Sequence, residues 1–491
     1  MSRISQAISS VLLACITTAG ASAQCTFAMG TTSTVSPFLS QPRGVVAADF
    51  NGDGRLDVVT AASGMLVFAQ GNGDGTFGTN INSSVALGNI LGIVAIDFNS
   101  DGRMDIVGAS ASSNMIVVLA GNGAGSFTLV ANYPSFSGPS AIALGDYDND
   151  ARQDIFWVNF GSGTFGGLRN LGGGNFAQLP LQSTGSMSAG PQGLALADFT
   201  GDGNLDIAVA NQSATNVTVF MGNGAGGFTQ YDTLNAGISP AAIAAADLNG
   251  DGRPDIACAN FNGGTLSWSF STGPGFGAFA ATSSVGSYRG ICIADVNSDG
   301  RPDLIGTAAS PSVTNVYLGL GGGTFGAANT LVNMGSGPWG IAPADFNSDG
   351  RIDLAVGFNV SNTTNAYINT SNTPPVISSH PVGISVIDGS PASFTVIASG
   401  PGIGYQWRRN YVNLTNGGAI SGATSPTLTL APTAMADNLS LYDCVITNTC
   451  SSITSRMAAL SVLQCPADFN GDGEVDFFDY LDFVDGYSSG C

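Results

Sequence analysis

The chain has 491 residues, which is too long for one ordinary hydrophobic core and predicts two to four domains. Its formal net charge is −21, with 34 acidic and 13 basic residues, and such a chain repels phosphate backbones, which excludes nucleic-acid binding. Charged residues make up only 10% of the chain and Gly reaches 69, so short strands joined by tight turns are favoured over long surface helices.

The N-terminus has the parts of an export signal. Arg3 gives the positive start, Val11–Ile16 the apolar stretch and residues 21–23 a small-residue cleavage site, so residues 1–23 are expected to be removed. The alternative is a lipoprotein signal that ends at Cys15. Both predict a secreted or cell-surface protein. No later stretch of the sequence has the ~18 apolar residues that a transmembrane helix needs.

A short acidic pattern recurs seven times along the chain. Its first residues are Asp49, Asp97, Asp146, Asp198, Asp247, Asp295 and Asp345, so the spacing is 48 to 52 residues. Around each pattern the sequence predicts four strands: one apolar strand before it, two after it, and a more polar strand that follows a Gly-rich turn such as 121–127. Strand-rich repeats with a period near 50 residues are typical of β-propeller blades.

These repeats resemble the FG-GAP/VCBS repeats of integrin α-chain propellers and of many bacterial surface proteins. The resemblance implies an all-β fold with a seven-bladed propeller at residues 24–370 and a calcium loop between the first and second strands of each blade. The seventh repeat lacks its Gly-rich turn and its fourth strand, and Cys25–Thr34 looks like the missing piece. We therefore expect the N-terminal strand to complete the seventh blade, which would leave no open edge strand.

The repeated acidic loops follow the pattern D-x-[DN]-x-D-G-x-x-D, and together with one C-terminal loop they hold 27 of the 34 acidic residues. Ca²⁺ takes six to eight oxygen ligands. Positions 1, 3, 5 and 9 offer side-chain oxygens, position 7 offers its carbonyl, and Gly at position 6 permits the sharp turn. The sequence therefore predicts seven structural calcium sites in the propeller and one in the C-terminal unit. Ala151 at position 6 and Thr200 at position 3 mark the two sites that are expected to be weak.

The predicted calcium ligands are Asp49, Asn51, Asp53, Arg55, Asp57, Asp97, Asn99, Asp101, Arg103, Asp105, Asp146, Asp148, Asp150, Arg152, Asp154, Asp198, Thr200, Asp202, Asn204, Asp206, Asp247, Asn249, Asp251, Arg253, Asp255, Asp295, Asn297, Asp299, Arg301, Asp303, Asp345, Asn347, Asp349, Arg351 and Asp353, and in the C-terminal unit Asp468, Asn470, Asp472, Glu474, Asp476 and Asp479.

Two smaller units follow a linker at residues 371–375. Residues 376–463 resemble a bacterial immunoglobulin-like domain, with Trp407 as the buried strand-C tryptophan and Tyr442 as the tyrosine of the corner motif, two residues before Cys444. Residues 465–491 resemble one calcium-loop half of a dockerin, of which a full dockerin carries two. That resemblance implies surface docking, and whether this unit docks to a partner or anchors the protein stays open.

Eight cysteines are present, and Cys15 should leave with the signal. The expected disulfides are Cys444–Cys450, which would close a hairpin, and Cys465–Cys491, which would clamp the small C-terminal unit. Cys258 and Cys292 lie in neighbouring blades and could form a third pair. Cys25 would then be the odd thiol.

The sequence offers no catalytic constellation. It has no lysine, its single histidine, His380, lies at a loop beside Pro381, and no G-x-S-x-G or H-E-x-x-H motif occurs. We therefore expect a non-enzymatic binding or adhesion module for an extracellular glycan or protein. The alternatives are a structural envelope or matrix component, and a calcium-dependent polysaccharide lyase with an arginine or tyrosine base.

The expected ligand site lies at the turns that enter the first strand of each blade. The residues at these turns are Arg43, Leu91, Ser140, Gln192, Ala241, Arg289 and Trp339. Closure of the ring would bring Arg43, Tyr288, Arg289 and Trp339 together, with aromatic faces for sugars and arginines for carboxylates or sulfates. In the alternative, the arginines pair with nearby acids and Trp339 plugs the channel.

Overall fold

The computed structural model describes residues 29–36, 41–185, 188–273, 275–332, 335–371, 374–400, 402–448, 451–463, 474 and 476–488. It divides into one unit at Phe27–Ser371 and a second that includes Asn372–Cys491. The described elements are 38 strands, one 3-10 helix and one α-helix, so the expected all-β fold is confirmed. None of the described helices is long and apolar enough to cross a bilayer.

The first unit contains strands β1 to β27. They are β1 (Met29–Ser36), β2 (Gly44–Ala48), β3 (Asp57–Gly71), β4 (Phe77–Ile96), β5 (Asp105–Ser110), β6 (Met115–Gly121), β7 (Phe127–Pro134), β8 (Pro139–Gly145), β9 (Asp154–Asn159), β10 (Thr164–Gly172), β11 (Asn175–Gln178), β12 (Gln182–Ser183), β13 (Pro191–Ala197), β14 (Asp206–Asn211), β15 (Asn216–Gly222), β16 (Phe228–Leu234), β17 (Pro240–Ala246), β18 (Asp255–Asn260), β19 (Thr265–Ser269), β20 (Ala280–Ala281), β21 (Tyr288–Ala294), β22 (Asp303–Ala308), β23 (Val313–Gly321), β24 (Thr324–Val332), β25 (Pro338–Ala344), β26 (Asp353–Phe358) and β27 (Thr363–Asn369).

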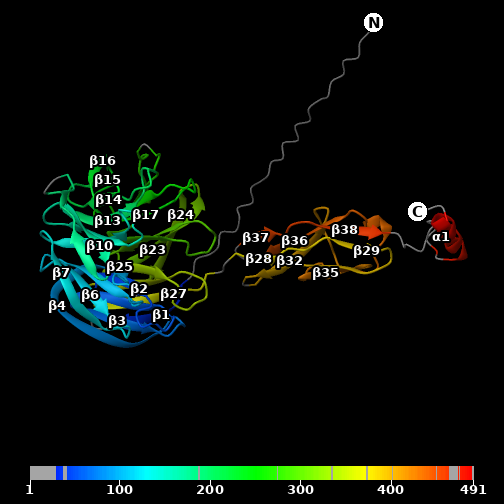
Figure 1. Ribbon diagram of the computed structural model, residues 1–491, viewed down its shortest axis with the longest axis horizontal. Helices are drawn as coiled ribbons and strands as arrows, with labels where there is room; N and C mark the ends of the chain where they lie inside the picture. The colour runs from blue at the N-terminus through cyan, green and yellow to red at the C-terminus, as the bar shows by residue number, and fades with distance from the viewer. Residues whose placement is uncertain are drawn as a thin grey trace, which may run out of the picture. The chain divides into compact units, whose positions relative to one another are not determined.

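These strands form six antiparallel sheets (Figure 1). Four sheets follow the chain directly: β8 to β11 with β12 also on β10, β13 to β16, β17 to β20, and β21 to β24. The six-stranded sheet β2 to β7 holds two consecutive repeats, because the long strand β4 pairs with β3 in its first part and with β5 in its last part. The sheet pattern thus follows the period of the sequence.

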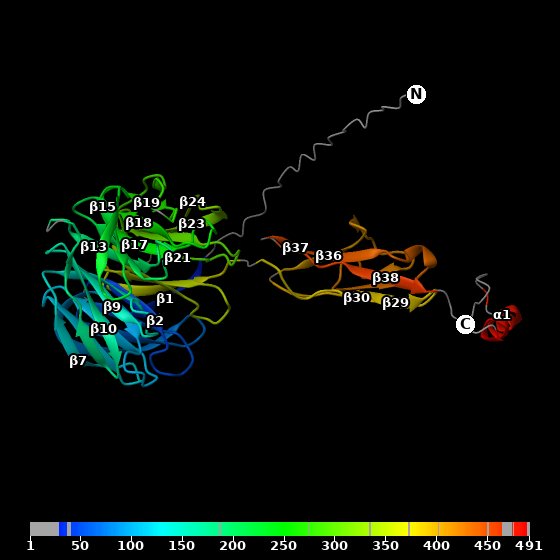
Figure 2. The same cartoon turned by 45° about the horizontal axis from the view of Figure 1, so that its top comes forward.

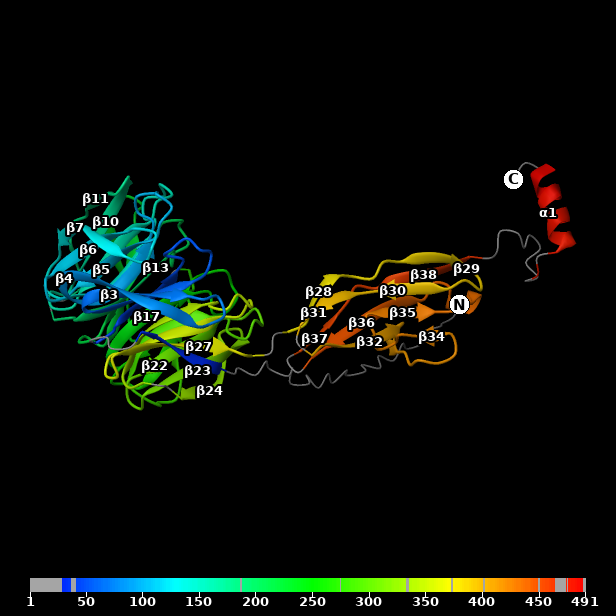
Figure 3. The ribbon, with the colours of Figure 1, turned by 90° about the horizontal axis from the view of Figure 1, so that it is seen from below.

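The last sheet joins the two ends of this unit. Its order is β1-β27-β26-β25, and β1 pairs antiparallel with β27, with Thr32 opposite Tyr367. Figure 3 shows the blue N-terminal strand beside yellow β27. The seventh repeat has no fourth strand of its own in sequence, and β1 occupies the place beside its third strand.

The first strands of the repeats contact one another in chain order. These inner strands are β2, the last part of β4, β8, β13, β17, β21 and β25, and β25 in turn contacts β2. Small residues make the close approach feasible. A Cβ added at Gly340 would lie 2.1 Å from the carbonyl oxygen of Arg43, and one added at Gly290 would lie 2.4 Å from that of Trp339.

Apolar side chains fill the space between adjacent sheets. Trp157 of β9 packs in one cluster with Val118 of β6, and the ring of Trp268 on β19 meets Phe325 of β24 edge to face with centroids 4.9 Å apart. The second strand of each repeat is buried along its whole length, for example β5 and β9. This pattern is expected for strands that are covered on both faces.

The second unit contains β28 (Val376–Ser379), β29 (Ile384–Ile387), β30 (Ala392–Thr395), β31 (Ile397–Ser399), β32 (Gly404–Arg409), β33 (Val412–Asn413), β34 (Ile420–Ser421), β35 (Thr427–Leu430), the 3-10 helix η1 (Met435–Asp437), β36 (Leu441–Thr447), β37 (Ser452–Thr454), β38 (Ala458–Leu463) and helix α1 (Phe477–Ser488). Two sheets, one of β29, β38, β36, β32 and β33 and the other of β30, β35 and β34, share a core (Figure 2). That core includes Trp407, Tyr442 and Val396, all at most 1% exposed.

The predicted Cys444–Cys450 disulfide is wrong, because Cys444 is a free, fully buried thiol. Strand register explains the error. Cys444 lies opposite Trp407 in the core, and its N–H donates to Ser455 Oγ at 2.9 Å. Cys258 and Cys292 are also free, since they lie in two different core clusters. Residues 1–23, Cys25, Cys450, Cys465 and Cys491 lie outside the described residues.

Candidate functional site

The seven acidic loops share one hydrogen-bonding pattern. In each, the carboxylate at position 1 accepts hydrogen bonds from the backbone N–H groups of positions 5 and 6, as Asp97 does from Asp101 at 3.1 Å and Gly102 at 2.9 Å. The carboxylate at position 5 accepts from the N–H of position 7, as Asp101 does from Arg103 at 2.9 Å. These short-range bonds fold the loop back on itself, so that side-chain oxygens from alternate positions gather on its inner side.

The aspartate at position 9 is fully buried in every loop. The seven residues are Asp57, Asp105, Asp154, Asp206, Asp255, Asp303 and Asp353, each with an exposed fraction of 0%. Each accepts one bond from the N–H of position 2 and another from an N–H near the end of the third strand or just after it, as Asp105 does from Phe98 at 3.2 Å and Gly121 at 2.8 Å. Burial raises the pKa of Asp105 to about 6 and that of Asp303 to about 7. Two N–H donors therefore do not offset the desolvation of this charge, and a cation would.

The backbone at position 6 is left-handed in all seven loops. In six loops the residue is glycine, with φ between +80° and +85°, and in the third it is Ala151 with φ +65°. A Cβ added at Gly54 or Gly102 would meet nothing within 4 Å. The cost of alanine at this position is therefore backbone strain rather than a clash.

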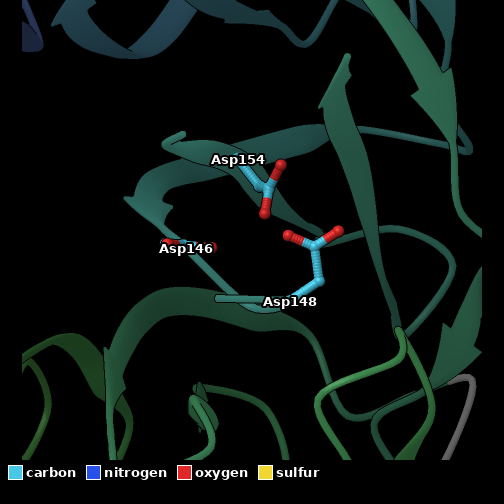
Figure 4. A group of neighbouring side chains, drawn as sticks. All are labelled: Asp146, Asp148 and Asp154. Atoms are coloured by element: carbon cyan, nitrogen blue, oxygen red, sulfur yellow. The ribbon is translucent and has the colours of Figure 1, made fainter. Parts of the chain in front are cut away.

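The third loop differs from the others. Carboxylate oxygens of Asp146, Asp148 and Asp154 lie within 4.8 Å of one another, and Figure 4 shows Asp148 and Asp154 facing each other. Both carboxylate oxygens of Asp148 are buried without a hydrogen bond. Arg169 of β10 places Nε 2.5 Å from Asp148 Oδ2, outside hydrogen-bond geometry, and Nη2 3.7 Å from Asp150 Oδ2. In this loop the guanidinium of Arg169 places a positive charge beside the carboxylates of Asp148 and Asp150.

Sequence reasoning missed Arg169. Arg169 lies 15 residues after position 9 of its loop. The residues at the equivalent place, which is 13 residues after position 9 in the first repeat and 15 in the others, are Gln70, Ala120, Met221, Phe270, Leu318 and Ile368. The signal was present, since Arg169 is the one charged residue in that column.

Only part of the C-terminal loop is described. Asp468, Asn470 and Asp472 lie outside the described residues, and Glu474 is exposed. The Asp476 N–H donates to Asp479 at 2.7 Å, and Asp479 is 2% exposed at the start of α1. The structure thus brings the last two predicted ligands of this loop together.

A cavity of about 260 Å³ lies where the inner strands converge. All seven residues at the predicted turns line it: Arg43, Leu91, Ser140, Gln192, Ala241, Arg289 and Trp339. We call these the rim residues and this space the central cavity.

Two rim arginines are stacked on one aromatic ring. The Cζ atoms of Arg43 and Arg289 lie 4.5 and 4.4 Å from the ring centroid of Trp339, and Arg289 also lies 3.4 Å from that of Phe261. The expectation that Trp339 offers a free face to sugars is therefore replaced by a cation–π role. Phe261 follows β18 and was missed, because no periodic pattern marks it.

Neither arginine takes part in an ion pair among the described residues, and the Nε atoms of both are buried without a hydrogen bond. The alternative in which nearby acids neutralise them therefore has no support in the described ion pairs. Burial, and next the charge of Arg43, lowers the pKa of Arg289 to about 10, and burial also lowers the pKa of Arg43. Both remain charged at neutral pH, so the central cavity carries uncompensated positive charge.

The prediction for Tyr288 is wrong. Its side chain is 0% exposed and its Oη lies 2.9 Å from Tyr317 Oη, while Asn315 donates to it at 2.7 Å. Successive side chains of a strand point to opposite faces, so Arg289 faces the central cavity and Tyr288 the interior between sheets.

The model of the FG-GAP-like repeat matches residues 49–108, 97–157, 146–209, 198–258, 247–306 and 295–356, which together cover more than half of the chain. The chain belongs to the FG-GAP-like repeat family. The predicted resemblance is thereby confirmed for this part of the chain, and repeats of this family are typical of extracellular proteins.

Other comparisons add little. No curated protein matches the chain. A titin M10–obscurin-like 1 Ig complex is 23% identical, with 20% of this chain and 99% of that chain covered and a TM-score of 0.18. Titin M4 is 21% identical over 19% and 98% (TM-score 0.17), and Duf (Kirre) D1 is 18% identical over 18% and 98% (TM-score 0.17).

Proposed function

We propose that this chain is a secreted, calcium-stabilised, seven-bladed β-propeller protein that binds an acidic extracellular ligand, glycan or protein, at the central cavity. One observation carries the proposal: Arg43 and Arg289 lie partly buried against the same ring of Trp339, each with its Nε buried and unbonded, and neither has a carboxylate partner among the described ion pairs. Buried charges in folded proteins are normally paired. In a chain of net charge −21, two unpaired arginines at one cavity favour a ligand that supplies the missing negative charge.

The blade assignment is supported by seven inner strands that contact one another in a cycle and by seven acidic loops at the same place in each repeat. The donors at positions 1, 3, 5 and 9 and the carbonyl at position 7 would hold Ca²⁺, whose charge would neutralise the buried position 9 carboxylate. The third site is the exception, because Arg169 already lies against Asp148.

The second unit is proposed to be an Ig-like domain followed by a dockerin-like calcium unit. The packing of two sheets around Trp407 and Tyr442 supports the first assignment. The position of Asp476 and Asp479 at the start of α1 supports the second. These units would present the propeller at a surface.

Binding is favoured over catalysis at the central cavity. An arginine base would have to be deprotonated, and the pKa of Arg289 stays near 10. Tyr288, the tyrosine next to the rim residue Arg289, is buried and points away from the cavity. A lyase mechanism has no candidate base among the rim residues.

A glycan and extracellular-protein array tests the proposal, with the calcium-loaded full chain as probe. Wild type should bind acidic ligands and lose them after EDTA treatment. The variant Arg289→Ala with Trp339→Ala should lose the same ligands, while Arg456→Ala, which removes an exposed arginine of the second unit, should keep them. Equal binding by the double variant in folded form would refute the site.

A further inference from the structure

The rim residues of the central cavity are not evenly distributed in charge. Arg289, Trp339 and Arg43 stand on or directly beside the consecutive inner strands β21, β25 and β2. Ser140 and Gln192 belong to β8 and β13, on the other side of the ring order, and the apolar Leu91 and Ala241 separate the two groups. One side of the cavity is therefore cationic and the opposite side is neutral and polar.

The neutral side presents one unsatisfied acceptor. Ser140 Oγ donates to the backbone oxygen of Pro191 at 3.1 Å, so its hydrogen is already used. Gln192 Oε1 is buried without a hydrogen-bond partner. An acceptor that is removed from water and left unpaired costs free energy, which a ligand hydroxyl could recover by donating to it.

The cationic side is built for a planar anion. The guanidinium groups lie against the ring of Trp339, which leaves their N–H edges for other partners. Guanidinium edges bind carboxylates with two parallel hydrogen bonds. Because both arginines already lie against the ring of Trp339, ligand selectivity at this cavity comes from charge and hydrogen bonds rather than from aromatic stacking.

The size of the central cavity limits the ligand. Its volume of about 260 Å³ is many times the ~10–15 Å³ of cavity space that one water molecule needs. This space suits one ring-sized molecule, and a continuous polymer would need a longer groove.

We infer that the central cavity selects a single hydroxy-carboxylic acid unit, of which a terminal uronic acid residue is the extracellular example, with its carboxylate on Arg43 and Arg289 and a hydroxyl donated to Gln192 Oε1. This inference rests on the proposed function and specifies its ligand class. It assigns Gln192 as the residue that separates sugar acids from simple oxyanions.

Tryptophan fluorescence of the calcium-loaded full chain gives a direct test. Trp157, Trp268 and Trp407 are buried, and Trp339 is the partly exposed one that lines the cavity, so a ligand here should change its emission. The probes are glucuronate, galacturonate, the neutral sugars glucose and galactose, and inorganic sulfate. We expect saturable binding of a uronate, none of the neutral sugars, and sulfate at least about tenfold weaker.

Variants separate the two sides of the cavity. Gln192→Met keeps the length of the side chain but removes the acceptor, and should weaken uronate binding about tenfold, or about 1.4 kcal/mol, without changing sulfate binding. Arg289→Gln should weaken both probes. Arg456→Ala should weaken neither. Melting curves of each variant identify any that fails to fold, and Gln192→Ala provides a second deletion of the acceptor.

The outcomes distinguish this inference from the proposed function. Sulfate binding as tight as uronate binding, or unchanged uronate binding in both Gln192 variants, would overturn the inference and leave an anion site that depends on Arg289. Array binding of acidic polymers that free uronates do not displace would also overturn the inference alone. If no acidic probe binds in either format, both proposals fail.

Discussion

Replacing Ala151 by glycine should stabilise the third acidic loop by about 0.75 kcal/mol, the difference between the midpoints of two opposing terms. An L-residue in the left-handed region costs about 1–2 kcal/mol, and Ala151 adopts φ +65° where six other loops have glycine. Glycine has greater conformational freedom in the unfolded chain, which reduces the stabilisation by about 0.5–1 kcal/mol. No steric term enters, because a Cβ at the equivalent Gly102 meets nothing within 4 Å.

Scanning calorimetry at saturating calcium measures this effect. With about 2.1 cal/mol/K per residue, unfolding of the unit Phe27–Ser371 has an entropy of about 0.7 kcal/mol/K, so the expected rise in melting temperature is about 1 °C. Gly102→Ala in the second loop is the matched reverse change and should lower it by a similar amount. If Gly102→Ala destabilises the protein and Ala151→Gly has no effect, the reasoning about strain in the third loop is refuted.

Three further predictions concern charge and thiols. Arg169→Met should lower the stability of the calcium-free protein and enlarge the rise in stability that added calcium causes, because Asp148 would lose the guanidinium beside it. An equal calcium-dependent rise in stability in variant and wild type would contradict this. Calcium-stripped protein should be more stable at pH 5.5 than at pH 7.5. Burial raises the pKa of four position 9 carboxyl groups to about 6 and that of Asp303 to about 7; the four are Asp57, Asp105, Asp154 and Asp353. Because these folded-state pKa values lie above the unfolded ones, stability is lost as the pH rises through them. Urea melts at both pH values check the sign, and a higher stability at pH 7.5 would show that another group dominates. The three buried thiols, Cys258, Cys292 and Cys444, should react with a thiol reagent only once the protein is unfolded, in the absence of reductant. Mass spectrometry counts the labelled cysteines. Protection of any of the three after unfolding would indicate a disulfide.

The sequence was sufficient for features that repeat. The period of the acidic loops predicted where each repeat begins, and the same period predicted all seven rim residues, because each occupies one column of the repeat. The stacking of Arg43 and Arg289 on Trp339 could be expected only by assuming that the ring closes.

Features that depend on one repeat alone were missed or mispredicted. Arg169 was marked only by its departure from the other residues of its column, and Phe261 contacts Arg289 of the next repeat, which no periodicity encodes. Tyr288 was placed at the cavity because it precedes Arg289, yet the alternation of side chains along β21 turns it inward. Cys444 was paired by its spacing to Cys450, while strand register directs it into the core.

Arg43 and Arg289 of the central cavity are proposed to bind an acidic ligand. The most direct measurement is the shift in melting temperature that an acidic ligand from the array causes in the calcium-loaded wild type and in Arg43→Gln with Arg289→Gln. A ligand that binds only the folded form raises the melting temperature by an amount that grows with the logarithm of ligand concentration over Kd. We expect a clear rise for wild type and none for the double variant, and an equal rise in both proteins would show that Arg43 and Arg289 do not bind the ligand.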